Sequence, residues 1–228
     1  ANLYRLGYSI PEDVGLSSEK LKNIEKTIDT ILKEKMAPGA QVLVARKGKV
    51  VYQKSFGHHT NNQQEKVTNS DLYDVASLTK ILASLPLIMK AEEEGVFSLN
   101  STLKELLPFF KKSNKDTITV KEMLAHNGRL KSWIPFYKNT QDSITGANLQ
   151  QYYGAKKTSL YKTKVAENLY LRKNYKDSIY AYIKEAPQRE TAGYKYSDLG
   201  YYIFKEVLEK KYKMSLAKLA DETFYKAM

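Results

Sequence analysis

Serine followed three residues later by lysine is the pattern in this chain that is best suited to nucleophilic catalysis. The two side chains lie on one face of a helix, so the amine can reach the hydroxyl. Burial or a nearby helix N-terminus favours the neutral amine, which can accept the serine proton. About one such match is expected by chance in a chain of this size. The chain contains five pairs: Ser17/Lys20, Ser77/Lys80, Ser101/Lys104, Ser159/Lys162 and Ser215/Lys218.

The surroundings of Ser77 distinguish it from the other four serines. A short strand-like segment, residues 72–76, precedes it, and a strongly apolar segment follows it. The sequence therefore predicts that Ser77 and Lys80 are buried at a junction between a strand and a helix. Ser17 and Ser215 begin ordinary amphipathic helices, which is typical of N-caps, and a cap role remains an alternative for Ser77 as well.

Tyr196 is the second candidate. It precedes Ser197 and Asp198 at the predicted start of a helix, where its phenol could relay a proton beside a cationic amine. Tyr137, two residues before Asn139, is a competing candidate. Because the chain has 18 tyrosines, packing in the core or at a rim remains the alternative for each of them.

The predicted elements are a helix, a β-hairpin and then a mainly helical chain. A helix begins after Leu16 and ends before Pro38, and a Lys-Gly turn joins two Val-rich strands, residues 40–46 and 49–56. Further helices are predicted over residues 77–94 with a kink at Pro86, 120–125, 199–210 and 216–224, with a second hairpin turning at residues 173–174. Two strands alone do not make a stable sheet. The order favours α/β layering with an antiparallel sheet that needs further strands.

The composition excludes several classes of protein. With 228 residues, 42% of them hydrophobic, the chain can bury the core of one domain. No apolar stretch is long enough to span a membrane. The absence of cysteine excludes disulfides, thiol nucleophiles and thiolate metal sites. His58 and His59 form a loop pair without further ligands, so no metal site is predicted.

The net charge of +12 is unevenly distributed, and half of it falls within residues 154–184. Seven tyrosines lie between Tyr152 and Tyr182, and basic residues interleaved with aromatic ones can form a nucleic-acid surface. No nucleic-acid-binding signature accompanies them. The favoured interpretation is a solvated face rich in lysine and tyrosine, which would attract anionic substrates.

Five segments in a fixed order carry a family resemblance. They are residues 56–57, 75–80, 94–99, 120–126 and 196–201. From about Leu16 to Met228 the chain resembles the serine β-lactamase and penicillin-binding-protein superfamily, in particular its class C-like group. Residues 133–137 resemble the branch fused behind family 3 glycoside hydrolases in Bacteroidetes-type bacteria.

The resemblance implies a β-lactamase/transpeptidase-like α/β fold, an antiparallel sheet flanked by helices. Residues 1–228 would form one incomplete domain, with residues 1–15 as an N-terminal extension and residues 127–190 as a variable insert.

Catalytic roles follow from the resemblance. Ser77 would be the nucleophile that carries the acyl group, and Lys80 its base. Tyr196 would pass the proton to the leaving group and help to activate the deacylating water. The backbone N–H of Ser77 would be one oxyanion donor. His126 matches a position that is usually structural, and no metal or cofactor is implied.

Asp198 departs from the family pattern, which often has asparagine at this place. A carboxylate near Lys80 would favour the charged amine and oppose its role as a base. The hypothesis is that Asp198 belongs to the substrate-binding site, where it interacts with Lys80 or a neighbouring donor and influences specificity.

The family's third motif, Lys or His, a variable residue and Gly, has no counterpart, since Gly200 is the only glycine after Asp198. The last three sheet strands and the closing helix of the family are also missing. We expect an N-terminal part of a longer protein, or a remainder supplied by another chain, and no hydrolysis by these 228 residues alone. Robust turnover by the purified chain would contradict this.

The function that the resemblance implies is a serine hydrolase acting through an acyl-enzyme on esters, β-lactams or peptidoglycan-derived peptides. The alternative is a non-catalytic cell-wall-binding or accessory module with a degenerate scaffold, whose Lys/Tyr patch binds anionic polymers. Either role implies a periplasmic or secreted protein of the bacterial cell envelope. A fused glycosidase domain would be a natural partner, whereas nucleic acid and a membrane span are not expected.

Overall fold

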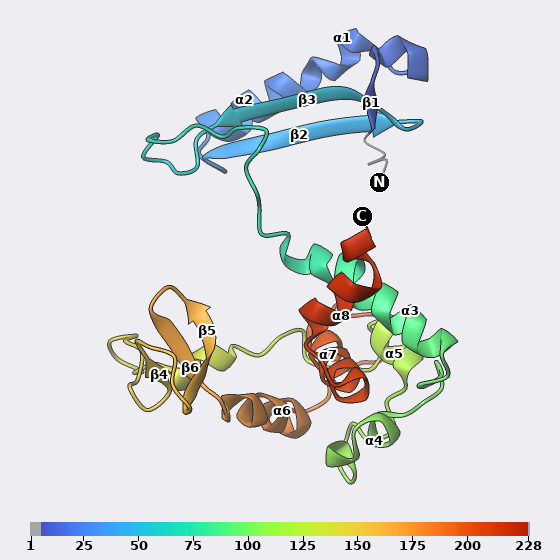
Figure 1. Cartoon of the computed structure of the whole chain (residues 1–228), viewed down its shortest axis with the longest axis vertical. Helices are drawn as coiled ribbons and strands as arrows, with labels where there is room; N and C mark the ends of the chain where they lie inside the picture. Colours follow the sequence, from blue (N-terminus) through green and yellow to red (C-terminus); the bar gives the residue numbers. More distant parts are fainter. Residues whose placement is uncertain (1–5, 228) are drawn as a thin grey trace. The chain divides into compact units, whose positions relative to one another are not determined.

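The computed structural model describes residues 6–227 and divides the chain into two compact units, one ending at Val75 and the other beginning at Ala76 (Figure 1). Each unit has secondary structure of its own. The first holds a small sheet and the second holds most of the helices. The predicted α/β class is therefore confirmed in the form of helices combined with small sheets that are mainly antiparallel.

The first unit is a three-stranded sheet with helices along it (Figure 1). The strand order is β1-β3-β2, with β1 parallel to β3 and β2 antiparallel to it. The bounds are β1 Gly7–Tyr8, α1 Ser18–Leu21, α2 Asn23–Lys33, β2 Gly39–Arg46 and β3 Lys49–Gly57. The predicted helix is confirmed, with a break at Lys22 between α1 and α2.

The predicted hairpin is also confirmed. Its two turn residues, Lys47 and Gly48, have φ of 50° and 72°, which is the turn geometry that matches the twist of antiparallel strands. Gly57 ends β3 with φ of 68°, and a Cβ there would lie 2.3 Å from the carbonyl oxygen of Pro38. Only glycine allows the two backbones to approach so closely.

The second unit has a continuous hydrophobic core between its helices. The helices are α3 Leu85–Glu93, α4 Leu103–Leu106, α5 Val120–Leu124, α6 Tyr175–Glu185, α7 Leu199–Tyr212 and α8 Leu216–Thr223. Leu87 and Ile88 of α3 and Ile203 and Phe204 of α7 are almost fully buried in this core. Because α7 supplies buried residues along most of its length, its N-terminus is held firmly, and this is the end nearest Tyr196.

The segment around Ser77 differs from the prediction. Residues 72–76 form no strand, and the chain from residue 76 is a 3-10 turn, Ala76–Leu78, followed by a π-helix, Lys80–Ser84, before α3 begins. The predicted helix over residues 77–94 is thus confirmed in position, but it consists of three segments of different helix type and not of one α-helix with a kink.

Pro86 explains the change of helix type. Proline lacks an N–H and its ring collides with the carbonyl four residues earlier, so an α-helical register cannot run through Pro86 from Leu82. The N–H of Leu85 instead bonds to the carbonyl of Lys80, one residue further back than in an α-helix. The Leu82 carbonyl accepts a hydrogen bond from the Tyr225 hydroxyl.

A second small sheet has the order β4-β6-β5. Its strands are β4 Tyr153–Gly154, β5 Tyr161–Ala166 and β6 Leu169–Arg172. The predicted turn at residues 173–174 was wrong, because β5 and β6 turn at residues 167–168 and Asn174 instead precedes α6. Tyr175 and Ile183 recur at helical spacing and are buried, so core packing selects a helix for this tyrosine-rich segment.

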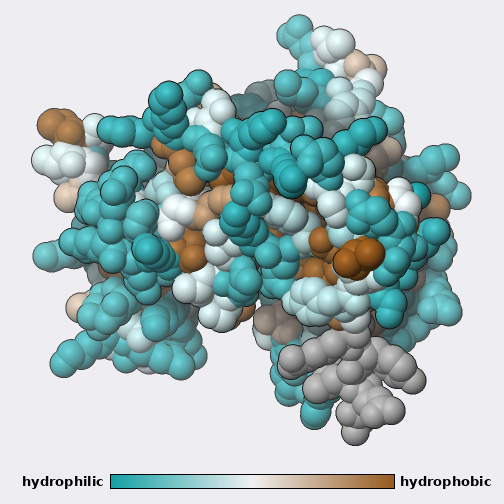
Figure 2. Space-filling view, turned by 90° about the horizontal axis from the view of Figure 1, so that it is seen from above, coloured by the Kyte–Doolittle hydropathy of each residue, from teal (hydrophilic) through white to brown (hydrophobic). Residues whose placement is uncertain are grey.

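The lysine-rich composition is visible at the surface. Hydrophilic residues predominate on the face drawn in Figure 2, and hydrophobic ones form small separate patches. Strand β5, which carries Lys162 and Lys164, is exposed along most of its length. Within the described residues, no helix combines the length and apolar character that crossing a bilayer requires.

Candidate active site

Ser77, Lys80 and Tyr196 meet around one hydroxyl group. The Lys80 amine donates a hydrogen bond to Ser77 Oγ at 3.0 Å. The Tyr196 hydroxyl donates to the same oxygen at 3.0 Å, although 119 residues separate the two in the sequence. The structure thus brings together the three residues that the sequence analysis selected, within a distance that allows proton transfer.

The local backbone explains why Ser77 points toward Lys80. Ala76, the residue before Ser77, has φ of 43°, in the left-handed region that side chains other than glycine rarely adopt. Ser77 lies in the 3-10 turn that follows, and Lys80 is the first residue of the π-helix. Tyr196 comes from the loop before α7, where Asp198 occupies the N-cap position.

Asp198 forms an ion pair with Lys80, with 2.7 Å between Oδ1 and the amine. Burial lowers the pKa of Lys80, but hydrogen bonds and charge interactions with Asp198 and Tyr196 outweigh it, so the net pKa lies above its usual value. The expected interaction of Asp198 with Lys80 is confirmed. The expectation of a neutral amine is wrong, because the carboxylate stabilises the charged form.

The site is also more open than predicted. Ser77 is exposed, and the side chain of Lys80 retains 16% of its accessible surface. The predicted burial of the pair at a strand-to-helix junction is therefore wrong, since residues 72–76 form no strand and the 3-10 turn leaves Ser77 at the surface. A depression of about 370 Å³ adjoins the site, and its lining includes Ser77, Lys80, Asp198, Tyr201 and Leu216.

The competing residues have other roles or positions. Ser17 and Ser215 each accept the backbone N–H of the lysine three residues later, both at 3.3 Å, and the N-cap prediction for them is confirmed. Tyr137 lies half-exposed in a short 3-10 helix, Phe136–Thr140. It is Tyr196, not Tyr137, that contacts Ser77.

His126 makes contacts that could not be predicted from the sequence. It was interpreted as a packing residue, and its ring does lie against those of Tyr194, Tyr196 and Tyr201. In addition its Nδ1 accepts the backbone N–H of Ser197 at 3.2 Å. No spacing in the sequence indicates this contact, because 71 residues separate the two.

The loop histidines belong to the first unit. His59 Nε2 lies 2.6 Å from Asp71, and the hydrogen bond to this carboxylate raises the pKa of His59, with Glu65 adding to the effect. Among residues 6–227 no group of three or more His, Asp or Glu side chains is arranged to hold a metal ion.

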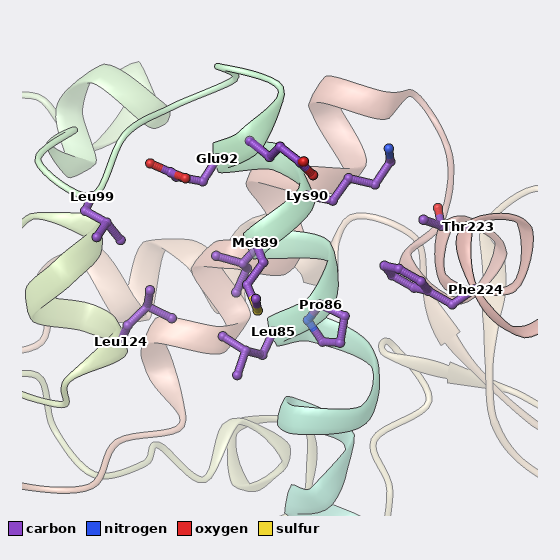
Figure 3. A pocket seen from close by; sticks show the side chains of 11 residues that line it. Leu85, Pro86, Met89, Lys90, Glu92, Leu99, Leu124, Thr223 and Phe224 are labelled. Carbon is purple, nitrogen blue, oxygen red and sulfur yellow. The ribbon is translucent and has the colours of Figure 1, made fainter.

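A larger cavity, of about 800 Å³, lies along α3 in the second unit. Figure 3 shows Leu85 and Met89 pointing toward Leu99 and Leu124, with Phe224 beyond Pro86. Its lining is mainly apolar and includes none of the three residues around the Ser77 hydroxyl. The smaller depression is therefore the place where a substrate would meet the nucleophile.

Two curated proteins are similar to this chain in sequence. Residues of this chain are 31% identical over 136 positions to protein flp of Staphylococcus aureus strain N315, covering 58% of this chain and 26% of that protein. They are 24% identical over 235 positions to the "Putative D-alanyl-D-alanine carboxypeptidase" of Escherichia coli K12, covering 96% of this chain and 48% of that protein. The chain thus spans half or less of the length of these relatives.

Solved structures share the fold. The octameric penicillin-binding protein homologue from Pyrococcus abyssi is 20% identical, with a TM-score of 0.65 over 90% of this chain and 42% of its own. A class C β-lactamase from Rhodobacter sphaeroides is 18% identical, with a TM-score of 0.60 over 89% of this chain and 48% of its own.

The Beta-lactamase family model matches residues 24–228, a range that contains every residue around the Ser77 hydroxyl. The match covers most of the chain and establishes that it belongs to the β-lactamase family of serine hydrolases.

Proposed function

We propose that this chain carries the nucleophilic half of a serine acyl hydrolase or acyltransferase, with Ser77 as the residue that is acylated. The observation that carries the proposal is the convergence of two proton-transfer groups, Lys80 and Tyr196, on Ser77 Oγ at 3.0 Å each. A serine used only for packing or capping needs neither contact.

The reaction follows from these three side chains. Ser77 Oγ attacks the substrate carbonyl while its proton passes to the neutral amine of Lys80, and an oxyanion forms. Tyr196 then donates its hydroxyl proton to the departing group, the carbonyl reforms, and the acyl group stays on Ser77. The proton on Lys80 returns to the Tyr196 oxygen, directly or through water, since both groups border Ser77 Oγ.

The ion pair with Asp198 sets the pH at which this reaction is fast. The raised pKa of Lys80 keeps most of the amine charged at neutral pH. While the pH is below that pKa, the small neutral fraction of the amine grows about tenfold for each unit by which the pH rises. Acylation therefore accelerates toward alkaline pH.

The substrates that we propose are strained or activated acyl compounds, namely β-lactams, esters and D-alanyl peptides of peptidoglycan. The relatives' names support β-lactams and D-alanyl peptides, because they include a D-alanyl-D-alanine carboxypeptidase and class C β-lactamases. We therefore propose that the protein acts in the cell envelope and is periplasmic or secreted.

The direct test is labelling of the complete gene product with a fluorescent penicillin and a fluorophosphonate. We expect one label per molecule, on the peptide that contains Ser77, with a rate that rises from pH 6 to about pH 9. A protein that resists both probes, yet binds anionic wall polymer through the Lys162/Lys164 face, would support the accessory-module alternative instead.

A further inference from the structure

His126 lies just after the end of α5, in a left-handed backbone conformation. It comes two residues after the last residue of α5, its N–H bonds to the carbonyl of Met123 at 3.2 Å, and its φ is 55°. A residue just after a helix often adopts this left-handed conformation, as Lys213 does after α7. The contacts of the His126 side chain, and not its backbone dihedrals, indicate what the ring does.

His126 accepts two hydrogen bonds, from the residues on either side of Tyr196. The backbone carbonyl of His126 accepts the N–H of Lys195 at 3.0 Å. Its ring Nδ1 accepts the N–H of Ser197 at 3.2 Å. The residues on both sides of Tyr196 are thus tied to one residue, and the His126 ring lies 4.7 Å from the Tyr196 ring, measured between centroids.

The loop after His126 also binds the segment that follows Tyr196. The Lys131 carbonyl accepts the Ser197 hydroxyl at 2.6 Å, and the Ser132 carbonyl accepts the N–H of Asp198 at 2.8 Å. These bonds involve backbone carbonyls, which do not titrate. Of the hydrogen bonds that hold the segment around Tyr196, the Ser197–Nδ1 bond is the one that depends on the protonation state of its acceptor.

Nδ1 can accept a hydrogen bond only when it carries no proton, which places the hydrogen of neutral His126 on Nε2. Burial lowers the pKa of His126, Lys80 lowers it further, and Asp198 opposes them. The other titratable groups against the ring are the phenols of Tyr194, Tyr196 and Tyr201. The charge of Lys80 and the bond to Ser197 thus both favour the neutral ring.

We propose that His126 is a positioning residue of the acylation reaction, which holds the Tyr196 hydroxyl against Ser77 through the Nδ1–Ser197 bond and releases it when the ring is protonated. The inference rests on the proposed function of Ser77 and goes beyond it, because His126 touches neither the substrate nor Ser77 in this role.

The hydrogen bond is testable without activity. In protein labelled with ¹⁵N-histidine, the ring nitrogens of His126 are assigned by comparison with the His126→Asn variant. We expect the Nε2–H tautomer at pH 7, in which Nδ1 has no directly bonded proton and the nitrogen-15 chemical shift of an unprotonated ring nitrogen. A proton on Nδ1 at this pH overturns the proposal, whatever the protein does to substrates.

Acylation by fluorescent penicillin then tests the consequence in the complete gene product. Below the pKa of His126, the slope of log rate against pH should increase by about one unit. The reason is that His126 as well as Lys80 must then lose a proton before the reaction. His126→Asn keeps an acceptor that suits the left-handed backbone, so the rate at pH 8 should stay within about threefold, and the steepening should disappear.

His126→Ala removes the acceptor and should slow acylation about ten- to a hundredfold at every pH, the size expected when a reacting group is misplaced. His58→Asn is the matched control, because this histidine lies in the other unit, and its pH profile should follow the unsubstituted protein. Melting curves of each variant separate misfolding from misplacement. Steepening that persists in His126→Asn overturns the positioning role, whereas absence of labelling in the unsubstituted protein overturns the proposed function itself.

Discussion

Ser77/Lys80 and Ser215/Lys218 have the same spacing and different structures. Ser215 has extended backbone dihedrals, φ −65° and ψ 149°, and its Oγ accepts the backbone N–H of Lys218. The Lys218 amine turns to Glu222 instead, at 3.5 Å. At Ser77 the hydroxyl accepts the Lys80 amine itself, and a tyrosine from a distant loop joins it.

The difference shows what the spacing does and does not decide. Three residues of separation let the amine reach the hydroxyl in both places. At a regular helix start, however, unpaired backbone N–H groups compete for the serine oxygen and convert it into a cap. The 3-10 and π segments around Ser77 give the hydroxyl a different orientation, toward side chains. Helix type therefore separates a nucleophile from a cap.

The largest expected effect is that of Ser77→Ala on covalent labelling. Without the hydroxyl no acyl bond can form, so the fluorescent penicillin signal should fall to background. Intact-mass spectrometry after incubation with the probe measures this. Ser215→Ala is the matched control and should label like the unsubstituted protein. Equal loss of labelling in both variants would remove the distinction between the two serines.

Tyr196→Phe should produce the next largest effect. It keeps the ring against His126 but removes the hydroxyl that bonds to Ser77. Loss of one proton-transfer group lowers rates by about 10²- to 10⁴-fold. Stopped-flow acylation kinetics provide the measurement, with Tyr137→Phe as the control that should remain unchanged. A Tyr196→Phe rate within threefold of the original would mean that Lys80 alone serves Ser77.

Asp198→Asn should have a smaller effect, in the opposite direction. Removing the carboxylate lowers the pKa of Lys80, so more of the amine is neutral at pH 7. The lower pKa should speed acylation at that pH and shift the rate profile toward acid.

Rate–pH profiles of Asp198→Asn and of Asp221→Asn, a substitution in α8, test this. An unchanged profile in Asp198→Asn would show that the ion pair does not control the base. Comparing an ester with a β-lactam in the same variant tests the predicted influence of Asp198 on specificity.

Ser215→Ala should have the smallest effect, and only on stability. Loss of an N-cap costs about 1 kcal/mol of unfolding free energy, and Ser215→Asp, which keeps an acceptor, should restore most of it. Denaturant unfolding measures both variants. A change in acylation rate without a change in stability would show that this serine is more than a cap.

Much of the fold could be predicted from local pattern. The hairpin, the helix before it, α5, α7 and α8 all follow from periodicity and turn chemistry that act over a few residues. The segment over residues 173–185 could not, because its tyrosines suit a strand or a helix equally. Burial of Tyr175 and Ile183 in the core decided for the helix.

The choice of Ser77, Lys80, Tyr196 and Asp198 came from the sequence, since residue types and ordered motifs select them without coordinates. The charge on these residues and the contacts that hold them depend on the tertiary structure. The charge on Lys80 depends on Asp198 at 2.7 Å, and the placement of Tyr196 depends on His126, contacts that join residues 118 and 70 positions apart in the chain. Electrostatic interactions and hydrogen bonds weaken with distance in space, and distance along the sequence does not matter to them. The tertiary structure alone therefore decided that Lys80 is charged and that Tyr196 is held in place.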